Sequence, residues 1–265
     1  MNYLLVILTL FCTVQLHAVD IVLNTQLDEK LKNMSSKDIK KDQSFEFNVL
    51  RKLEFEGLET ISEDLLRNEI SVFIGDTLDP FTINRNIKRI EALGFFDEVS
   101  SNIEDYEGGK KWTIIVRENP IVDAINFIGN ESISDDELNS VIQTSIGDIF
   151  NFSTVRDDVE KIEKRFSDEG FMFVKVKKVD LPTYKTKTLM FTIEESEYDD
   201  IGVSGNTKTK DYVILREIDI EEGDKLNEKE LKKNLQRIYN LNYFGQVYPD
   251  IQPSNATKNA YSLIL

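Results

Sequence analysis

The stretch INFIGNESISDDELNSVI, residues 125–142, decides how the chain is interpreted, because an apolar run ends at a glycine and a helix start follows directly. Ser134 and Glu137 have the spacing of a capping box, in which two side chains satisfy backbone N–H groups of the first helical turn. The pair Gly129-Asn130 is therefore either a ligand-binding loop or the turn between a strand and a helix. The two possibilities differ in whether the pattern recurs.

The pattern occurs three times. The stretches LEFEGLETISEDLL, INFIGNESISDDEL and IGVSGNTKTKDYVI each place a glycine after an apolar run: Gly57, Gly129 and Gly205. A glycine–aspartate pair follows at the same distance in each copy: Gly75-Asp76, Gly147-Asp148 and Gly223-Asp224. Because no copy has G-x-G-x-x-G spacing, the glycines are interpreted as turns in which a positive φ costs little, not as phosphate loops.

Farther along, each copy carries apolar residues at helical spacing, and these keep the same offsets between copies as the glycines do. The triplets are Ile83, Ile87 and Ile90; Val155, Val159 and Ile162; Leu231, Leu235 and Ile238. An alternating strand, a short helix, the Gly-Asp turn, this second helix and two closing strands make a β-α-α-β-β unit. We predict an α+β fold of three tandem domains, each with two helices packed on a three-stranded mixed sheet.

The triplets and Trp112 are expected in the cores of these domains. The domains are placed at residues 45–119, 120–196 and 197–265, the last cut off at its final strand. Asn119 and Pro120 mark the first junction, because proline interrupts strand pairing. The acidic pair Asp199-Asp200 marks the second, as a cap or a flexible joint. Ser62 predicts a weaker helix cap than Ser134.

The chain begins with MNYLLVILTLFCTVQLHA, which contains an uncharged apolar run. The run is shorter than the ~20 apolar residues that a spanning helix needs, and it fits a secretory signal peptide at residues 1–18. Residues 19–44 follow as a linker. The lack of Lys or Arg near the start leaves an uncleaved membrane anchor as an alternative, and Phe11 before Cys12 is too bulky for a lipoprotein signal.

Signal cleavage would remove Cys12 and His17, the only cysteine and the only histidine. The mature chain would then have no Ser-His-Asp triad, no Cys-His dyad, no zinc site built on Cys or His, and no disulfide. Its fold would depend on packing alone.

The formal charge of −16 disfavours nucleic-acid partners, because such a surface repels phosphate. The acids are interleaved with Lys and Arg and never follow calcium-loop spacing, so no metal and no other cofactor is predicted. The 48 acids leave a glycosidase-like carboxylate pair as an enzymatic alternative. No acid stands inside an apolar run that would raise its pKa, so we do not predict an enzyme.

The chain resembles polypeptide-transport-associated (POTRA) domains, the periplasmic arms of outer-membrane protein assembly factors of the BamA type. The resemblance rests on the glycines in FEG, FIGN and VSGN, on GD before the second helix, and on GFF, GFM and NYF at the next strand. It covers about residues 45–265 and implies an exported scaffold at the periplasmic face of the bacterial outer membrane. Its implied partners are unfolded outer-membrane β-barrel proteins and periplasmic or lipoprotein accessory subunits.

Alternatives remain open. The chain could be the POTRA arm of a two-partner secretion or TamA-type exporter, or a stand-alone periplasmic adaptor. A cell-division protein with a membrane helix before one such unit is another class. Assembly factors also carry a membrane β-barrel, which is missing from this chain, and we expect a truncated reading of a longer factor rather than a barrel-less relative.

The resemblance further implies binding by strand addition, in which a partner pairs with the unpaired N–H and C=O groups of a sheet edge. The implied edges are residues 95–104, 171–181 and 245–252. In the middle edge, apolar and basic residues that favour docking stand together: Phe171, Phe173, Lys175, Val176 and Lys177. The same lysines would equally protect an ordinary edge from aggregation.

Overall fold

The computed structural model describes residues 48–254 and 259–265 of the chain. The predicted signal peptide and linker, residues 1–44, lie outside this range. The chain divides into two compact units, and each is described by itself. The first runs up to Ile125 and includes Gln143–Asp157 and Leu181–Leu189, and the second comprises Asn126–Ile142, Asp158–Asp180 and Met190–Leu265.

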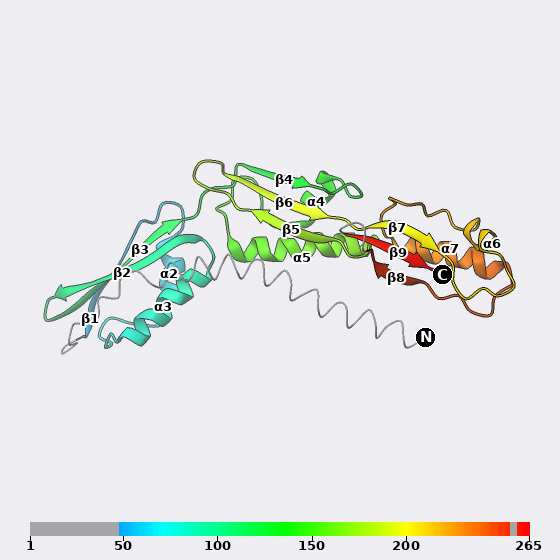
Figure 1. Cartoon of the computed structure of the whole chain (residues 1–265). Coiled ribbons are helices and arrows are strands. Elements are labelled where there is room, and N and C mark those ends of the chain that lie inside the picture. The colour runs from blue at the N-terminus through cyan, green and yellow to red at the C-terminus, as the bar shows by residue number, and fades with distance from the viewer. Residues whose placement is uncertain (1–47, 255–258) are drawn as a thin grey trace. The chain divides into compact units, whose positions relative to one another are not determined.

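The elements follow the order β-α-α-β-β three times (Figure 1). The first repeat contains β1 (Leu50–Glu56), α2 (Glu63–Glu69), α3 (Pro80–Ala92), β2 (Phe96–Tyr106) and β3 (Gly109–Glu118). The second contains β4 (Ala124–Ile128), α4 (Asp135–Val141), α5 (Phe152–Asp168), β5 (Lys175–Asp180) and β6 (Thr188–Glu194). The third contains β7 (Glu197–Gly202), α6 (Asp211–Leu215), α7 (Glu228–Asn240), β8 (Asp250–Pro253) and β9 (Ala260–Ile264).

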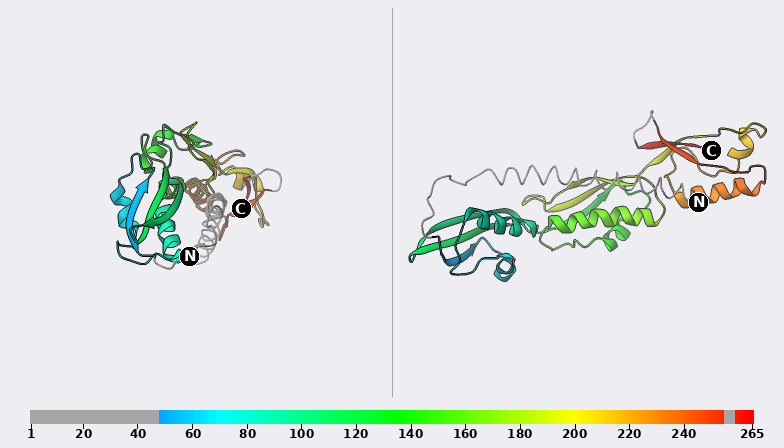
Figure 2. Two further views of the ribbon diagram at one scale, coloured as in Figure 1. Left: turned by 90° about the vertical axis from the view of Figure 1, so that its left-hand side faces the viewer. Right: turned by 90° about the horizontal axis from the view of Figure 1, so that it is seen from below.

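Each repeat folds into a three-stranded sheet whose last strand is central: β1-β3-β2, β4-β6-β5 and β7-β9-β8. In the first and third sheets the first strand pairs in parallel with the central strand, and the other neighbour pairs antiparallel. Figure 2 shows α5 and α7 from below, each along its own sheet. The predicted α+β class with three mixed-sheet units is confirmed.

The second helices begin at polar caps. Asp79 accepts a hydrogen bond from the Thr82 N–H group, and Asn227 accepts from the Lys229 and Glu230 N–H groups. The capping box between Ser134 and Glu137 is present, as predicted. The Ser62 side chain makes no capping hydrogen bond, so the weaker cap predicted there is wrong.

The apolar triplets lie in the cores, as predicted. Their buried members are Ile90, Val155, Val159, Ile162, Leu231 and Ile238. Ile83, Ile87 and Leu235 are partly buried and pack against the core of the first or third repeat. Trp112 of β3 is fully buried in the first core, which confirms its predicted role.

The turn glycines have the positive φ expected of them. The φ angles are +86° at Gly57, +84° at Gly129 and +83° at Gly205. A Cβ at Gly57 would overlap the carbonyl oxygen of Val116, and one at Gly129 would overlap that of Ile193. The first two glycines are therefore needed twice, for φ and for the close approach to the central strand.

We expect Gly57→Ala to lower the free energy of unfolding far more than Gly75→Ala. Both positions have positive φ, but nothing lies within 4 Å of a Cβ at Gly75. Gly75→Ala should cost about 1–2 kcal/mol for φ alone, and Gly57→Ala about 1–3 kcal/mol more for the overlap. Urea unfolding followed by the fluorescence of Trp112, the only tryptophan, measures both. Equal losses would contradict the role of close approach.

Candidate functional site

The sheet edges are the candidate site, and in each repeat the Gly-Asp turn bonds to the chain at or just before the start of the first strand. In the first repeat, Gly75 N–H donates to Leu50 O and Leu50 N–H donates to Asp76 O, both at 2.8 Å. The corresponding bonds join Val122 to Gly147 and Asp148, and Tyr198 to Gly223 and Asp224. The Gly-Asp turns therefore occupy the start of the first-strand edge, and β2, β5 and β8 form the other edges.

The candidate strand in the second repeat is shorter than predicted. Lys175, Val176 and Lys177 lie on β5, but Phe171 and Phe173 lie before it. Phe173 has a φ of +59°, which no regular strand residue adopts. The expectation of an edge strand from residue 171 onward is therefore wrong for its first four residues.

The residues expected in the strand but found before it are bound to the third repeat, within the second compact unit. Phe171 forms an isolated bridge with Asn227, and Met172 N–H donates to Leu226 O at 2.8 Å. The ring of Phe173 stacks on Tyr261, with 4.6 Å between centroids. This tertiary contact overrides the strand preference of the apolar sequence.

The remaining edge of β5 is partly occupied. The Val176 N–H group donates to a carboxylate oxygen of Glu163 on α5 at 2.9 Å, and the pairing of β5 with β6 is irregular between Val176 and Lys178. Lys177 pairs with Glu194 at 2.5 Å and Lys178 with Asp180 at 2.6 Å. These lysines are engaged by acids of their own sheet, which suits edge protection.

The β2 edge is longer and more regular. It has 11 residues, against 6 in β5 and 4 in β8. The β2–β3 hairpin closes through Glu107 and Gly108, both with positive φ (45° and 71°), as in a type I′ turn. In such a hairpin the residues that flank the turn, Tyr106 and Gly109, form a hydrogen-bonded pair. The N–H and C=O groups of Tyr106 therefore point toward β3.

The alternation that follows from this turn identifies the open backbone groups. Counting back from Tyr106, even-numbered residues of β2 direct their N–H and C=O groups toward β3. Val99, Ser101 and Ile103 direct theirs toward the open edge. Val99 is buried, Ser100 to Asn102 are exposed and Ile103 is half-buried, so this edge is most accessible from residue 100 to residue 103.

Charged side chains flank this segment and are paired within the sheet. Asp105 lies 2.5 Å from Lys110, and Glu104 lies 3.0 Å from Lys111. Hydrogen bonds to Glu54 and then to Glu104 raise the pKa of Lys111 above its ordinary value. At the other end Arg117 pairs with Asp97. The segment from Val99 to Ile103 itself carries no charge.

The third edge is the least suited to pairing. Residues 245–249 of the expected edge lie outside β8, which is Asp250–Pro253. Pro253 has no N–H group to donate. In the order of the sheets, β2, β5 and β8 are the edge strands.

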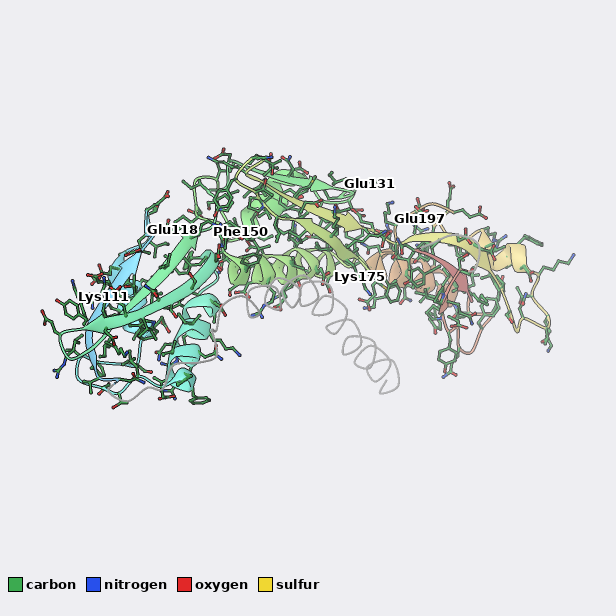
Figure 3. The ribbon with its side chains drawn as sticks, turned by 60° about the vertical axis from the view of Figure 1, so that its left-hand side comes forward. Lys111, Glu118, Glu131, Phe150, Lys175 and Glu197 are labelled. Carbon is green, nitrogen blue, oxygen red and sulfur yellow. The ribbon has the colours of Figure 1, made fainter. Side chains whose placement is uncertain are left out.

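At the first junction, Asn119 is buried and its side-chain amide donates to the carbonyls of Gly94 and Phe150, each at 2.9 Å. Pro120 O accepts from Phe150 N–H at 3.0 Å. These contacts lie within the first compact unit, and Figure 3 labels Phe150 beside Glu118 at this point.

At the second junction the prediction needs a correction. Asp199 and Asp200 lie within β7, the first strand of the third repeat. The residue before them, Tyr198, is fully buried and bonds to the third Gly-Asp turn. Asp199 accepts a hydrogen bond from the Ser254 hydroxyl group, within the third repeat. The contacts between the second and third repeats include the Leu226 N–H group, which donates to Ser196 O at 2.9 Å.

Glu118 is a residue that the sequence patterns did not single out. Its buried carboxylate accepts the N–H groups of Glu59, Thr60 and Ile61 at 2.8–3.1 Å. Glu195 holds Ser132 in the same way in the second repeat. The available signal was a glutamate at the last position of β3 and another directly after β6.

Within residues 48–254 and 259–265 no helix combines the length and the apolar character that a membrane span requires. The described part of the chain also holds no group of three or more His, Cys, Asp or Glu side chains placed to bind a metal ion.

Comparison with known proteins gives consistent matches. The POTRA family model, described as surface antigen variable number repeat, matches residues 48–119, 120–196 and 197–265. The outer membrane protein assembly factor BamA of Neorickettsia risticii is 26% identical over 229 residues, which cover 76% of this chain and 30% of that protein. BamA of Nitratidesulfovibrio vulgaris is 27% identical over 129 residues, 49% of this chain and 16% of that protein.

Among solved structures, the N-terminal domain of Omp85 from Thermosynechococcus elongatus has the same fold. It matches with a TM-score of 0.70 and 24% identity, over 84% of this chain and 97% of that one. The chain spans less than a third of the length of the curated relatives it matches.

We expect Glu163→Gln to change the pH dependence of stability. Burial raises the pKa of Glu163 above 4.5, although the Val176 N–H group and Lys175 oppose this. A raised folded-state pKa means that the stability contribution is complete below pH 4.5 and is lost as pH rises through the folded pKa. The variant keeps an acceptor for Val176 and should match wild type near pH 4 but gain stability relative to it by pH 7.

Urea unfolding followed by circular dichroism from pH 4 to pH 8 measures this difference. Asp168→Asn replaces an exposed acid on the same helix and is the matched control against which the Glu163→Gln trend is compared. A constant difference between Glu163→Gln and wild type across this range would contradict the burial of Glu163 as the cause.

Proposed function

Since the chain belongs to the POTRA family, we propose that it is the periplasmic scaffold of an outer-membrane protein assembly factor and that it binds client strands at the β2 edge. The relatives that it matches carry the name outer membrane protein assembly factor BamA. Its partners would be unfolded outer-membrane proteins or accessory subunits, and its role would be binding without catalysis.

The observation that carries this proposal is the open edge from Val99 to Ile103. Three residues there offer one donor and one acceptor each to an added strand. Each hydrogen bond contributes about 0.5–1.5 kcal/mol net, so association would be weak and reversible. A scaffold that passes its clients on needs such binding, and main-chain pairing makes few demands on client sequence.

The two faces of this edge also match the chemistry of an outer-membrane strand. Val99 and Ile103 lie opposite Val116 and Trp112, which belong to the core facing the helices, whereas Ser100 and Asn102 lie on the other face. α3 lies against β2 on the helix side. Outer-membrane strands alternate apolar and polar residues with a period of two, so an added strand would extend both faces.

The β5 edge is a second candidate within the same function. Lys175, Val176 and Lys177 lie on this edge strand, but Glu163 already accepts a hydrogen bond from the Val176 N–H group. Fewer open groups predict weaker pairing there than at β2.

Ser101→Pro should weaken binding of a synthetic peptide of about 10 alternating apolar and polar residues to the complete chain. The substitution removes an N–H group from the open edge, and proline is tolerated where that group faces away from the sheet. We expect at least about a tenfold rise in Kd, which corresponds to the loss of one or two net hydrogen bonds. Fluorescence anisotropy of the labelled peptide measures it.

Ser101→Ala keeps the N–H group and is the matched control, with an expected change below about twofold. The fluorescence of Trp112 checks that both variants fold. Equal affinity for Ser101→Pro and Ser101→Ala would contradict binding at β2. If Val179→Pro in β5 abolished binding instead, the edge of the second sheet would be the site.

A further inference from the structure

One asparagine and one glycine fasten the first repeat to the second, inside the first compact unit. The Asn151 side-chain amide donates to the carbonyl of Leu93 at 2.7 Å, at the end of α3. The oxygen of the same side chain accepts the N–H groups of Ser153 and Thr154 at 2.8 and 3.1 Å, at the start of α5. The Phe152 N–H group donates to Gly94 O at 3.2 Å.

The same joint recurs one repeat later, inside the second compact unit. The Asn227 amide donates to Glu169 O at 3.2 Å, and its oxygen caps α7 through Lys229 and Glu230. The Glu228 N–H group donates to Gly170 O at 2.8 Å. One side chain thus binds the helix end of one repeat and the helix start of the next.

Both members of each pair have a chemical requirement. Asn and Asp cap helices equally well, but only Asn also has N–H groups to donate to the preceding repeat. The glycine has a positive φ, +79° at Gly94 and +92° at Gly170. A Cβ at Gly94 would lie 2.7 Å from Oδ1 of Asn151, and one at Gly170 would lie 2.9 Å from Oδ1 of Asn227.

The first and third repeats carry different residues at two of the equivalent positions. Asp79 occupies the place of Asn151 in the first repeat and caps α3 through Thr82, but a carboxylate has no N–H group. Asn242 occupies the place of Gly94 in the third repeat, also with positive φ (56°), and carries a Cβ. Its amide donates instead to Asn240 O at 3.1 Å.

We propose that Asn151 and Asn227 are positioning residues that fasten consecutive repeats. Asp79 and Asn242, at the equivalent positions of the first and third repeats, lack the chemistry that this joint requires.

Substitution of Asn151 and Gly94 by the residues at the equivalent positions of the other repeats tests the proposal in the complete chain. Asn151→Asp copies Asp79, and Gly94→Asn copies Asn242. Each should speed hydrogen exchange of the Phe152 amide about tenfold or more, since the joint loses at least one hydrogen bond. Asn227→Asp should do the same at the Glu228 amide. The Ile83 amide, bonded to Asp79 O within α3, is the internal reference.

Asp79→Asn and Asn242→Gly are the reciprocal controls, and neither should change exchange at Phe152 or Glu228. Asn151→Asp keeps the helix cap, so a folded protein with faster exchange reports the joint alone. Unchanged exchange in Asn151→Asp, or an equal increase in Asp79→Asn, would overturn the proposal.

Discussion

The structure depends on the pairing of each repeat's first strand with its last. In the first and third repeats this pairing is parallel, and parallel neighbours cannot be joined by a tight turn. Two helices therefore intervene, and they cover one face. The last strand becomes central, so the antiparallel strand before it is left at an edge. The chemistry available for partner binding is a consequence of this one topological choice.

The same topology produces three edges of different quality. β2 is long and forms a hairpin with β3, and its uncharged middle segment lies between paired charges. β5 is shortened by the residues that bind the third repeat, and Glu163 occupies one of its N–H groups. β8 is short and contains Pro253. Local sequence differences therefore give the three copies of the fold edges with different numbers of open backbone groups.

The sequence predicted the fold well because its signals are periodic. The glycines mark positions that need positive φ, and the triplets mark helix faces that must be buried, so their common register revealed the repeats. Such signals are local, and each is repeated three times. The order of the elements followed without any knowledge of tertiary contacts.

The candidate site was less predictable, because it depends on contacts between distant residues. Phe171 and Phe173 have a strand-like pattern, yet Tyr261 and Leu226 draw this segment out of the strand. Nothing in the sequence distinguishes Glu118 from an acid at the protein surface, although its carboxylate accepts hydrogen bonds from three N–H groups. No period in the sequence reports these partners.

An edge with unpaired backbone groups risks pairing with copies of itself, and the first repeat has features that oppose this. An irregularity near Asp97 and paired charges at both ends of β2 disrupt long, flat pairing with an identical edge. The open middle is short, so under the proposed function one client strand would bind there, while an extended sheet would gain little. The second and third edges are protected by paired lysines and by proline. The unpaired backbone groups available to a partner are therefore concentrated in the first repeat. The contacts of Asn151 and Asn227 link the repeats with protected edges to it.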